Sequence, residues 1–130
     1  MVILDTSVII DHLRQDPSSS SLLAFSKKSP REEIGISIIS LQELYQGEST
    51  RQTQKENHLL ATVSGLQVLP YTYEVAELAG KISRDSEYDL EFVDAAIAAT
   101  TIHNGAKLFT LNKKHFVNIP DLELRASKVI

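Results

Sequence analysis

The sequence predicts an α/β protein, a three-layer α/β/α sandwich with a central, mainly parallel sheet of four to five strands. Short apolar runs rich in Ile, Val and Leu recur along the chain, and each is closed by a polar or turn residue, as buried strands are. Segments with helical spacing of apolar residues separate these runs. Such alternation is typical of a parallel sheet covered by helices on both faces. With 130 residues, the chain is predicted to form one domain, residues 1–130.

The first part of the chain begins with an apolar strand that ends in an aspartate, and a helix follows it. A turn of proline and serines leads into a second helix, which ends before Pro30 because the residue preceding a proline avoids helical backbone. An isoleucine-rich strand and a helix opened by a serine complete this part. The predicted elements are Val2–Asp5, Ser7–Arg14, Leu22–Lys28, Glu33–Ile39 and a helix from Ser40 to near Gly47.

The second part alternates in the same way. Its first and last helices each run into a glycine, the residue most often found just beyond a helix end. The long helix between them has Val75, Leu78, Ala79 and Ile82 at helical spacing. The predicted elements are the helices Arg51–Ser64, Thr72–Ser86 and Phe92–Asn104 and the strands Leu66–Leu69, Lys107–Leu111 and a short fifth, Leu122–Leu124.

Composition narrows the class of protein. An apolar fraction of 42% and a charged fraction of 23% are those of an ordinary soluble globule. Without cysteine there is neither a disulfide nor a thiolate metal site, which fits a reducing cytoplasm. The start lacks a basic leader, and no apolar run approaches the ~20 residues of a membrane span, so we expect a cytoplasmic protein. The net charge of -4 argues against extended binding of duplex nucleic acid.

Polar residues recur where the predicted strands end. Asp5 directly follows the first strand, and Glu43 lies in the first turn of the helix after the second. Asp94 lies in the first turn of the alanine-rich helix that leads into the fourth strand, and Asn112 follows that strand. Because parallel strands present their carboxyl ends at one edge of a sheet, we expect these four residues to share that edge.

Each acid also has a structural alternative. Asp5 could cap the following helix, and Asp94 could favour the positive end of its own helix. Glu43 completes the pattern Ser40-x-x-Glu43, a capping box. Against the alternative for Asp94, its helix has mostly small side chains and is predicted to be buried, and a buried carboxylate needs a partner or a metal.

Oxygen ligands without a His or Cys set suit Mg²⁺ or Mn²⁺ and not zinc. The four histidines are scattered, and none has ligand spacing. Carboxylates that hold Mg²⁺ are the working parts of phosphodiester hydrolysis, in which the ion acidifies a bound water and stabilises charge on the phosphate.

The motifs together resemble those of the PIN-domain nucleases, most closely the VapC-type toxins of toxin–antitoxin pairs. They are Leu4-Asp5-Thr6-Ser7-Val8-Ile9-Ile10, Ser40-Leu41-Gln42-Glu43-Leu44 with Gly47, Asp94-Ala95-Ala96-Ile97-Ala98-Ala99-Thr100, and Leu108-Phe109-Thr110-Leu111-Asn112 with Phe116. The resemblance covers nearly the whole chain. It implies a Mg²⁺-dependent endoribonuclease toxin that hydrolyses RNA through a metal-bound water held by an acidic cluster.

The resemblance implies that Asp5, Glu43 and Asp94 form this cluster. Asp5 and Asp94 would be the ligands of Mg²⁺, for which Mn²⁺ could substitute, and Glu43 a further ligand or a group that orients water. The fourth acidic position of the family falls on Asn112, whose neutral amide would hold a second ion weakly. The choice between one-metal and two-metal chemistry therefore stays open.

Supporting residues and partners are implied in the same way. Hydroxyls of Thr6 or Ser7 and of Thr110 would hold carboxylates or phosphate, and Lys113 and Lys114 would contact RNA phosphates. A homodimer and a VapB-type antitoxin, whose C-terminal segment occupies the active-site groove, are expected. Lesser candidates for phosphate contacts are Arg14, Arg84 and Lys107, whereas Phe116 is expected in the core.

Two other classes remain as alternatives. Because Asn112 weakens the cluster, the chain could be a non-catalytic PIN-type module that binds RNA or protein. A different α/β protein with an acid after its first strand is the second class. Haloacid-dehalogenase-type phosphatases carry Asp-x-Asp there, but position 7 is Ser. Phosphorelay receivers need an acidic pair that is missing, although Lys113 could pose as their lysine.

Overall fold

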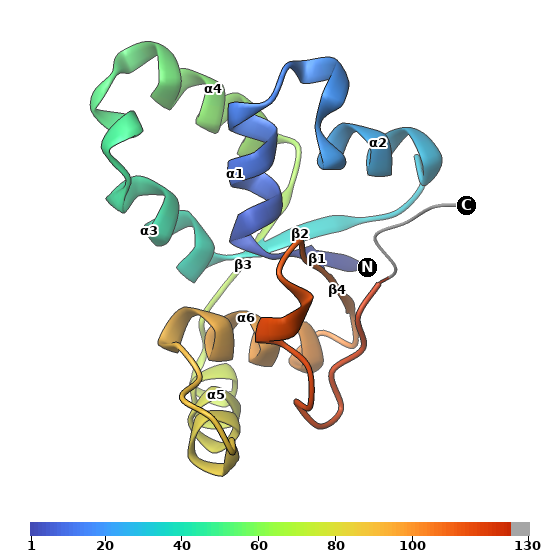
Figure 1. Cartoon of the computed structure of the whole chain (residues 1–130), viewed down its shortest axis with the longest axis vertical. Helices are drawn as coiled ribbons and strands as arrows, with labels where there is room; N and C mark the ends of the chain where they lie inside the picture. Colours follow the sequence, from blue (N-terminus) through green and yellow to red (C-terminus); the bar gives the residue numbers. More distant parts are fainter. Residues whose placement is uncertain (126–130) are drawn as a thin grey trace.

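The central sheet has four strands, all parallel, in the computed structural model, which describes residues 1–125 (Figure 1). The strands are β1 (Val2–Leu4), β2 (Ile34–Ser37), β3 (Gln67–Leu69) and β4 (Lys107–Phe109), in the spatial order β3-β2-β1-β4. The predicted fifth strand is reduced to one parallel bridge between Leu108 and Leu124. The predicted α/β fold with a mainly parallel sheet is confirmed.

One face of the sheet is covered by the four helices of the first half of the chain. Figure 1 shows α1 (Thr6–Arg14), α2 (Ser21–Lys28), α3 (Ile38–Gln46) and α4 (Thr53–Ser64) on the same side of the strands. Alternate strand residues point to this face. A single core forms there from buried apolar side chains of strands and helices, among them Val2, Leu4, Ile36 and Phe109 with Val8, Phe25, Leu44 and Leu59.

The other face is covered by α6 (Phe92–His103), with α5 (Tyr73–Asp85) packed outside it (Figure 1). Ile3 and Leu108 of the sheet pack against Ile97 and Ala98 of α6. Every residue from 95 to 101 is buried, because α6 lies between the sheet and α5 and its small side chains admit both. The prediction of a mostly buried alanine-rich helix is confirmed.

The boundary between β2 and α3 differs from the prediction. The strand ends at Ser37, whose hydroxyl accepts a hydrogen bond from the N–H of Ile39 at 3.1 Å and caps α3. Ser40 therefore lies inside the helix, and the predicted capping box of Ser40 and Glu43 is wrong. The run of β-branched isoleucines favoured an extended strand, but Ser37 caps the helix, so that Ile38 and Ile39, the last two residues of the run, are helical.

Other boundaries move by a few residues. β1 ends at Leu4, so Asp5 lies at the cap position of α1. The predicted helix start at Arg51 is wrong, because residues Glu48–Arg51 form a short 3-10 turn and α4 begins at Thr53. The predicted single domain 1–130 includes five residues that lie outside the described part. Within residues 1–125, none of the helices combines the length and apolar character that crossing a membrane requires.

Candidate active site

The site lies at the carboxyl-terminal edge of the sheet, where parallel strands end together. The N-termini of α1 and α3 follow β1 and β2 directly, and the segment from Thr110 follows β4. α6 leads into β4 and therefore starts at this same edge, beside α3, with which it is in contact. The fold thus brings Asp5, Glu43, Asp94 and the segment after β4 to one place, as the order of elements predicted.

Asp5 is buried, with only 5% of its surface exposed. Its side chain does not cap α1, which removes the structural alternative for this residue. Instead its Oδ2 accepts hydrogen bonds from Ser7 Oγ and from Thr110 Oγ1, both at 2.7 Å. Its backbone N–H donates to the Phe109 carbonyl at 2.9 Å, which places Asp5 beside β4. Hydroxyls from α1 and from the segment after β4 therefore fix the orientation of the Asp5 carboxylate through one oxygen, Oδ2.

The hydroxyls that hold Asp5 are themselves held by the segment after β4. Ser7 Oγ accepts from the Leu111 N–H at 3.2 Å, and Thr110 Oγ1 accepts from the Asn112 N–H at 2.9 Å. Thr6 has a different partner, because its hydroxyl donates to Ser40 Oγ at 3.0 Å and joins α1 to α3. Of the two hydroxyls expected to support the carboxylate, the structure places Ser7 there.

Asp94 lies in the first turn of α6, and its side chain is 14% exposed. Burial and the negative charge of Asp5 raise the pKa of Asp94 to about 6, with smaller contributions in the same direction from Glu91 and Glu43. His115 opposes this shift, with its Nδ1 3.4 Å from Asp94 Oδ2. The carboxylates expected to cluster are thus close enough to repel one another.

The remaining predicted residues are distributed around this pair. Glu43 is half-buried on α3 and also lines a hollow of about 630 Å³ between α1, α3 and α4, together with Arg14. Asn112 is exposed and directly precedes the short 3-10 turn η3 (Lys113–His115). The two lysines of this turn are also exposed. Phe116 is buried, as expected.

Two of the lesser candidates for phosphate contacts lie elsewhere. Lys107 begins β4 and so lies at the opposite edge of the sheet from the carboxylates. Arg84, in the last turn of α5, is engaged by its neighbour Asp85, whose oxygens accept its hydrogen bonds at 2.8 and 2.9 Å. The structure does not bring either of them to the candidate site.

Comparison with known proteins decides the family. A family model described as the PIN domain matches residues 2–122. The chain belongs to the PIN-domain family. The sequence is also 33% identical to Ribonuclease VapC19 of Mycobacterium tuberculosis over 129 residues, which covers 95% of this chain and 98% of that protein. The predicted PIN-domain resemblance is confirmed, and the phosphatase and receiver alternatives are excluded.

Solved structures give the same fold. The chain superposes with a TM-score of 0.84 on the DNA-bound VapBC of Salmonella typhimurium, at 21% identity and 98% coverage of both chains. VapBC2 from Rickettsia felis, bound to a promoter DNA fragment, also gives 0.84, at 25% identity over 96% of this chain and 98% of that one. FitAcB from Neisseria gonorrhoeae gives 0.76, at 23% identity and 98% coverage of both. The PIN fold is thus matched along nearly its whole length.

The donor set of this PIN domain fits Mg²⁺ in one respect and not in another. Among residues 1–125 there is no group of three or more His, Cys, Asp or Glu side chains that could hold a metal ion, so Glu43 does not complete a protein cage. Mg²⁺ seldom needs one, since it keeps several waters and binds through one or two carboxylates and substrate phosphates. Asp5 and Asp94 offer such a pair. Burial and then the charge of Asp5 raise the pKa of Asp94, and a bound cation would offset both effects.

Sequence reasoning missed two residues of this region. His115 faces Asp94, and Tyr88 contacts the backbone near His115 from the connection between α5 and α6. Both contacts join segments far apart in the chain, so no periodicity or short spacing signals them. The only available hint for Tyr88 is an aromatic residue within a connection that is otherwise acidic.

Proposed function

We propose that this PIN domain is a Mg²⁺-dependent endoribonuclease that hydrolyses phosphodiester bonds in RNA and acts as the toxin of a toxin–antitoxin pair. The observation that carries the proposal is the pair of carboxylates at the carboxyl-terminal edge of the sheet, Asp5, which is buried, and Asp94, which is partly buried. The similarity of the chain to a relative named as a ribonuclease supports RNA as the substrate.

Each residue has a defined task in this proposal. Asp5 and Asp94 would hold Mg²⁺, which when bound acidifies water and stabilises negative charge on phosphate. Ser7 and Thr110 keep the Asp5 carboxylate in one orientation, so little rotamer entropy is lost when the site forms. Glu43, half-buried beside the pair, orients the attacking water and accepts its proton.

Substrate binding falls to the segment that follows β4. Lys113 and Lys114 are exposed directly after Asn112, next to the hydrogen bonds that hold Asp5. Cationic side chains at this point would contact RNA phosphates and set the position of the strand. The exposed, neutral Asn112 adds no charge to the site, so we propose that one ion is held strongly and a second only weakly.

A VapB-type antitoxin is the proposed partner, because the matched structures are described as VapBC complexes. The hollow lined by Glu43 and Arg14 adjoins the candidate site, and its position supports a groove for the antitoxin's C-terminal segment. A homodimer and a cytoplasmic location complete the proposal. Light scattering of the purified protein measures the first, and fractionation of cells that express it measures the second.

Cleavage mapping tests the proposal. The protein is purified away from its antitoxin and incubated with total cellular RNA, with MgCl₂ or with EDTA, and the new RNA ends are sequenced. We expect cleavage at a small set of positions with Mg²⁺ and none with EDTA or with Asp5→Asn. Absence of Mg²⁺-dependent cleavage by the wild-type protein would overturn the proposal.

Asn112 favours one alternative, a non-catalytic module that binds RNA or protein, since it removes a charge from the family's acidic positions. Calorimetry with Mn²⁺ separates the two functions. The nuclease binds the ion at millimolar concentration or below, whereas the non-catalytic module shows no binding in that range.

A further inference from the structure

Tyr88 joins two distant parts of the chain. It lies in the connection between α5 and α6, and its hydroxyl is 3.2 Å from the carbonyl oxygen of His115 and 3.1 Å from that of Val117. A phenol has one proton, so the two carbonyls share one donor. The contact reaches across to the segment that runs from Asn112 to Val117, which we call the basic segment.

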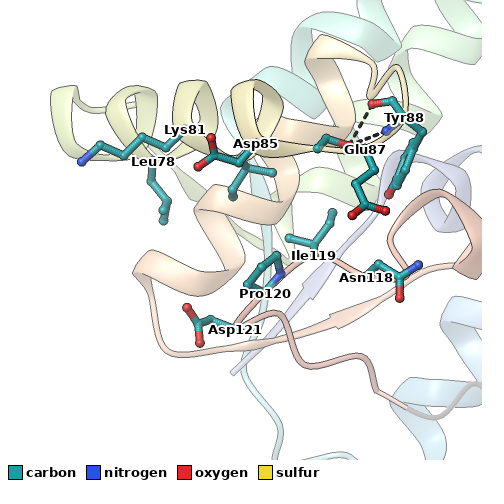
Figure 2. A pocket seen from close by; sticks show the side chains of 11 residues that line it. Leu78, Lys81, Asp85, Glu87, Tyr88, Asn118, Ile119, Pro120 and Asp121 are labelled. Atoms are coloured by element: carbon teal, nitrogen blue, oxygen red, sulfur yellow. Dashed lines mark hydrogen bonds between the residues drawn. The ribbon is translucent and has the colours of Figure 1, made fainter.

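The backbone of Tyr88 is held in a tight turn. Ser86 Oγ donates to the Tyr88 carbonyl at 2.8 Å and accepts from the Tyr88 N–H at 3.3 Å, as the dashed lines in Figure 2 show. The ring therefore projects from a fixed point toward the basic segment. Tyr88 therefore links the connection that leads into α6, the helix that carries Asp94, to the basic segment.

The basic segment has few restraints of its own. Its 3-10 turn is three residues long, and such a turn supplies few internal hydrogen bonds. At its start, the Asn112 N–H donates a hydrogen bond to Thr110 Oγ1. Near its end, the ring of Phe116 is buried in the core. Within residues 1–125, the other polar contacts of the segment with the rest of the fold are the two of the Tyr88 hydroxyl and the approach of His115 Nδ1 to Asp94 Oδ2 at 3.4 Å.

Packing does not replace these hydrogen bonds. A hollow of about 620 Å³ opens beside Tyr88, with Ile82 and Ile119 in its lining, and Figure 2 shows Asn118 and Glu87 around it. Tyr88 is 39% exposed. Because open space adjoins the ring of Tyr88, its hydroxyl supplies the contact that joins this connection to the carbonyls of His115 and Val117.

We propose that Tyr88 is a positioning residue for RNA. It holds the basic segment so that Lys113 and Lys114 meet substrate phosphates beside Asp5 and Asp94, and it does not itself touch the substrate. This inference rests on the proposed function. It predicts that loss of the hydroxyl weakens RNA binding and leaves the chemical step in place.

The test variant is Tyr88→Phe, which keeps the ring. In the isolated protein, we expect amide hydrogen exchange at His115 and Phe116 to accelerate about tenfold, since both N–H groups belong to the released turn. On an RNA identified by cleavage mapping, we expect KM to rise about three- to tenfold, the scale of one net hydrogen bond, with kcat within about twofold. The matched control is Tyr73→Phe, because Tyr73 is 79% exposed and its hydroxyl makes no hydrogen bond within residues 1–125.

A double-mutant cycle separates positioning from a general structural role. In the background Lys113→Ala with Lys114→Ala, Tyr88→Phe should not raise KM further, because the side chains that it positions are gone. An equal increase in both backgrounds, or wild-type exchange and KM in Tyr88→Phe, would overturn the inference. If the wild-type protein cleaves RNA and only these results fail, the proposed function stands. If it cleaves none, the proposed function itself fails.

Discussion

Asp5, which is buried, and Asp94, which is partly buried, are carboxylates at the same edge of the sheet, but the fold holds them in opposite ways. Asp5 receives hydrogen bonds from two hydroxyls that are themselves held by backbone N–H groups. Asp94 is partly buried near other acids, and this burial and the charge of Asp5 raise its pKa to about 6. One carboxylate is fixed in geometry, while the other is poised to gain a proton or a cation. A metal site needs both properties, and here they are divided between two residues.

The largest expected effect is on activity. Asp5→Asn and Asp94→Asn should each lower kcat/KM for RNA by at least about 100-fold, because each removes a charge that Mg²⁺ needs. Cleavage of the mapped RNA at saturating Mg²⁺ measures the effect, and circular dichroism verifies that both variants fold. Full activity of either variant would show that its carboxylate is not part of the site.

The same two variants should differ in stability. At pH 7 without metal, Asp94→Asn should be about 1–2 kcal/mol more stable than wild type, because it removes a partly buried charge from near other acids. Asp5→Asn should gain less, since it also loses hydrogen bonds to an ionised acceptor. Urea unfolding measures both values. Equal stability of the two variants would contradict the division described above.

The advantage of Asp94→Asn should depend on pH. The folded pKa of Asp94 is raised to about 6 from an ordinary 3.8, so between these values the folded wild-type protein binds a proton that the unfolded chain does not. Wild-type stability therefore gains relative to the variant as pH falls through 6, and the difference should vanish near pH 4. A stability difference that stays constant from pH 7 to 4 would show that the burial of the Asp94 charge and its repulsion by Asp5 are not the cause.

The hydroxyls around Asp5 should have a smaller effect. Thr110→Val and Ser7→Ala should each cost about 1–2 kcal/mol of stability, because each leaves a buried group with one hydrogen bond fewer. Each should also weaken Mn²⁺ binding about tenfold by releasing the carboxylate. Thr6→Val is the control, since its hydroxyl serves Ser40 and its loss should lower stability without changing Mn²⁺ affinity.

The smallest expected effect is at Asn112. Asn112→Asp adds a carboxylate at an exposed position next to the site, and it should tighten Mn²⁺ binding by about two- to tenfold. Calorimetry of the purified variant measures the change. Asp121 is exposed and lines the other hollow, with Lys81 and Asp85, and it offers the reverse control, because Asp121→Asn should leave the affinity unchanged. An unchanged affinity in Asn112→Asp would place this side chain outside the reach of the ion.

The fold and the place of the site could be predicted because both follow from where strands end. Asp5 follows a buried apolar run, and parallel pairing then brings Thr110 beside it. The sequence could not decide between Ser37 and Ser40 as the cap of α3, because either serine can cap a helix. The structure shows that the Ser37 hydroxyl accepts the hydrogen bond from the Ile39 N–H.

Contacts between distant segments were beyond the reach of the sequence. The hydroxyl of Tyr88 and the ring of His115 act across connections whose paths depend on how α6 packs between the sheet and α5. The pKa of Asp94 has the same origin, since it arises from burial and from charges on other elements. The sequence identified the candidate site residues from their types and positions, but their contacts and pKa values depend on tertiary packing.

The most direct test of the central claim is calorimetry of Mn²⁺ binding to the wild-type protein, Asp5→Asn and Asp94→Asn, at pH 6 and pH 8 in buffers of different ionisation enthalpy. If Asp5 and Asp94 jointly hold the ion, wild type binds one ion strongly and each variant binds at least about tenfold more weakly. At pH 6, binding to wild type should release about half a proton from Asp94, and at pH 8 almost none. Equal affinity in all three proteins, or the same proton release at both pH values, would contradict the account.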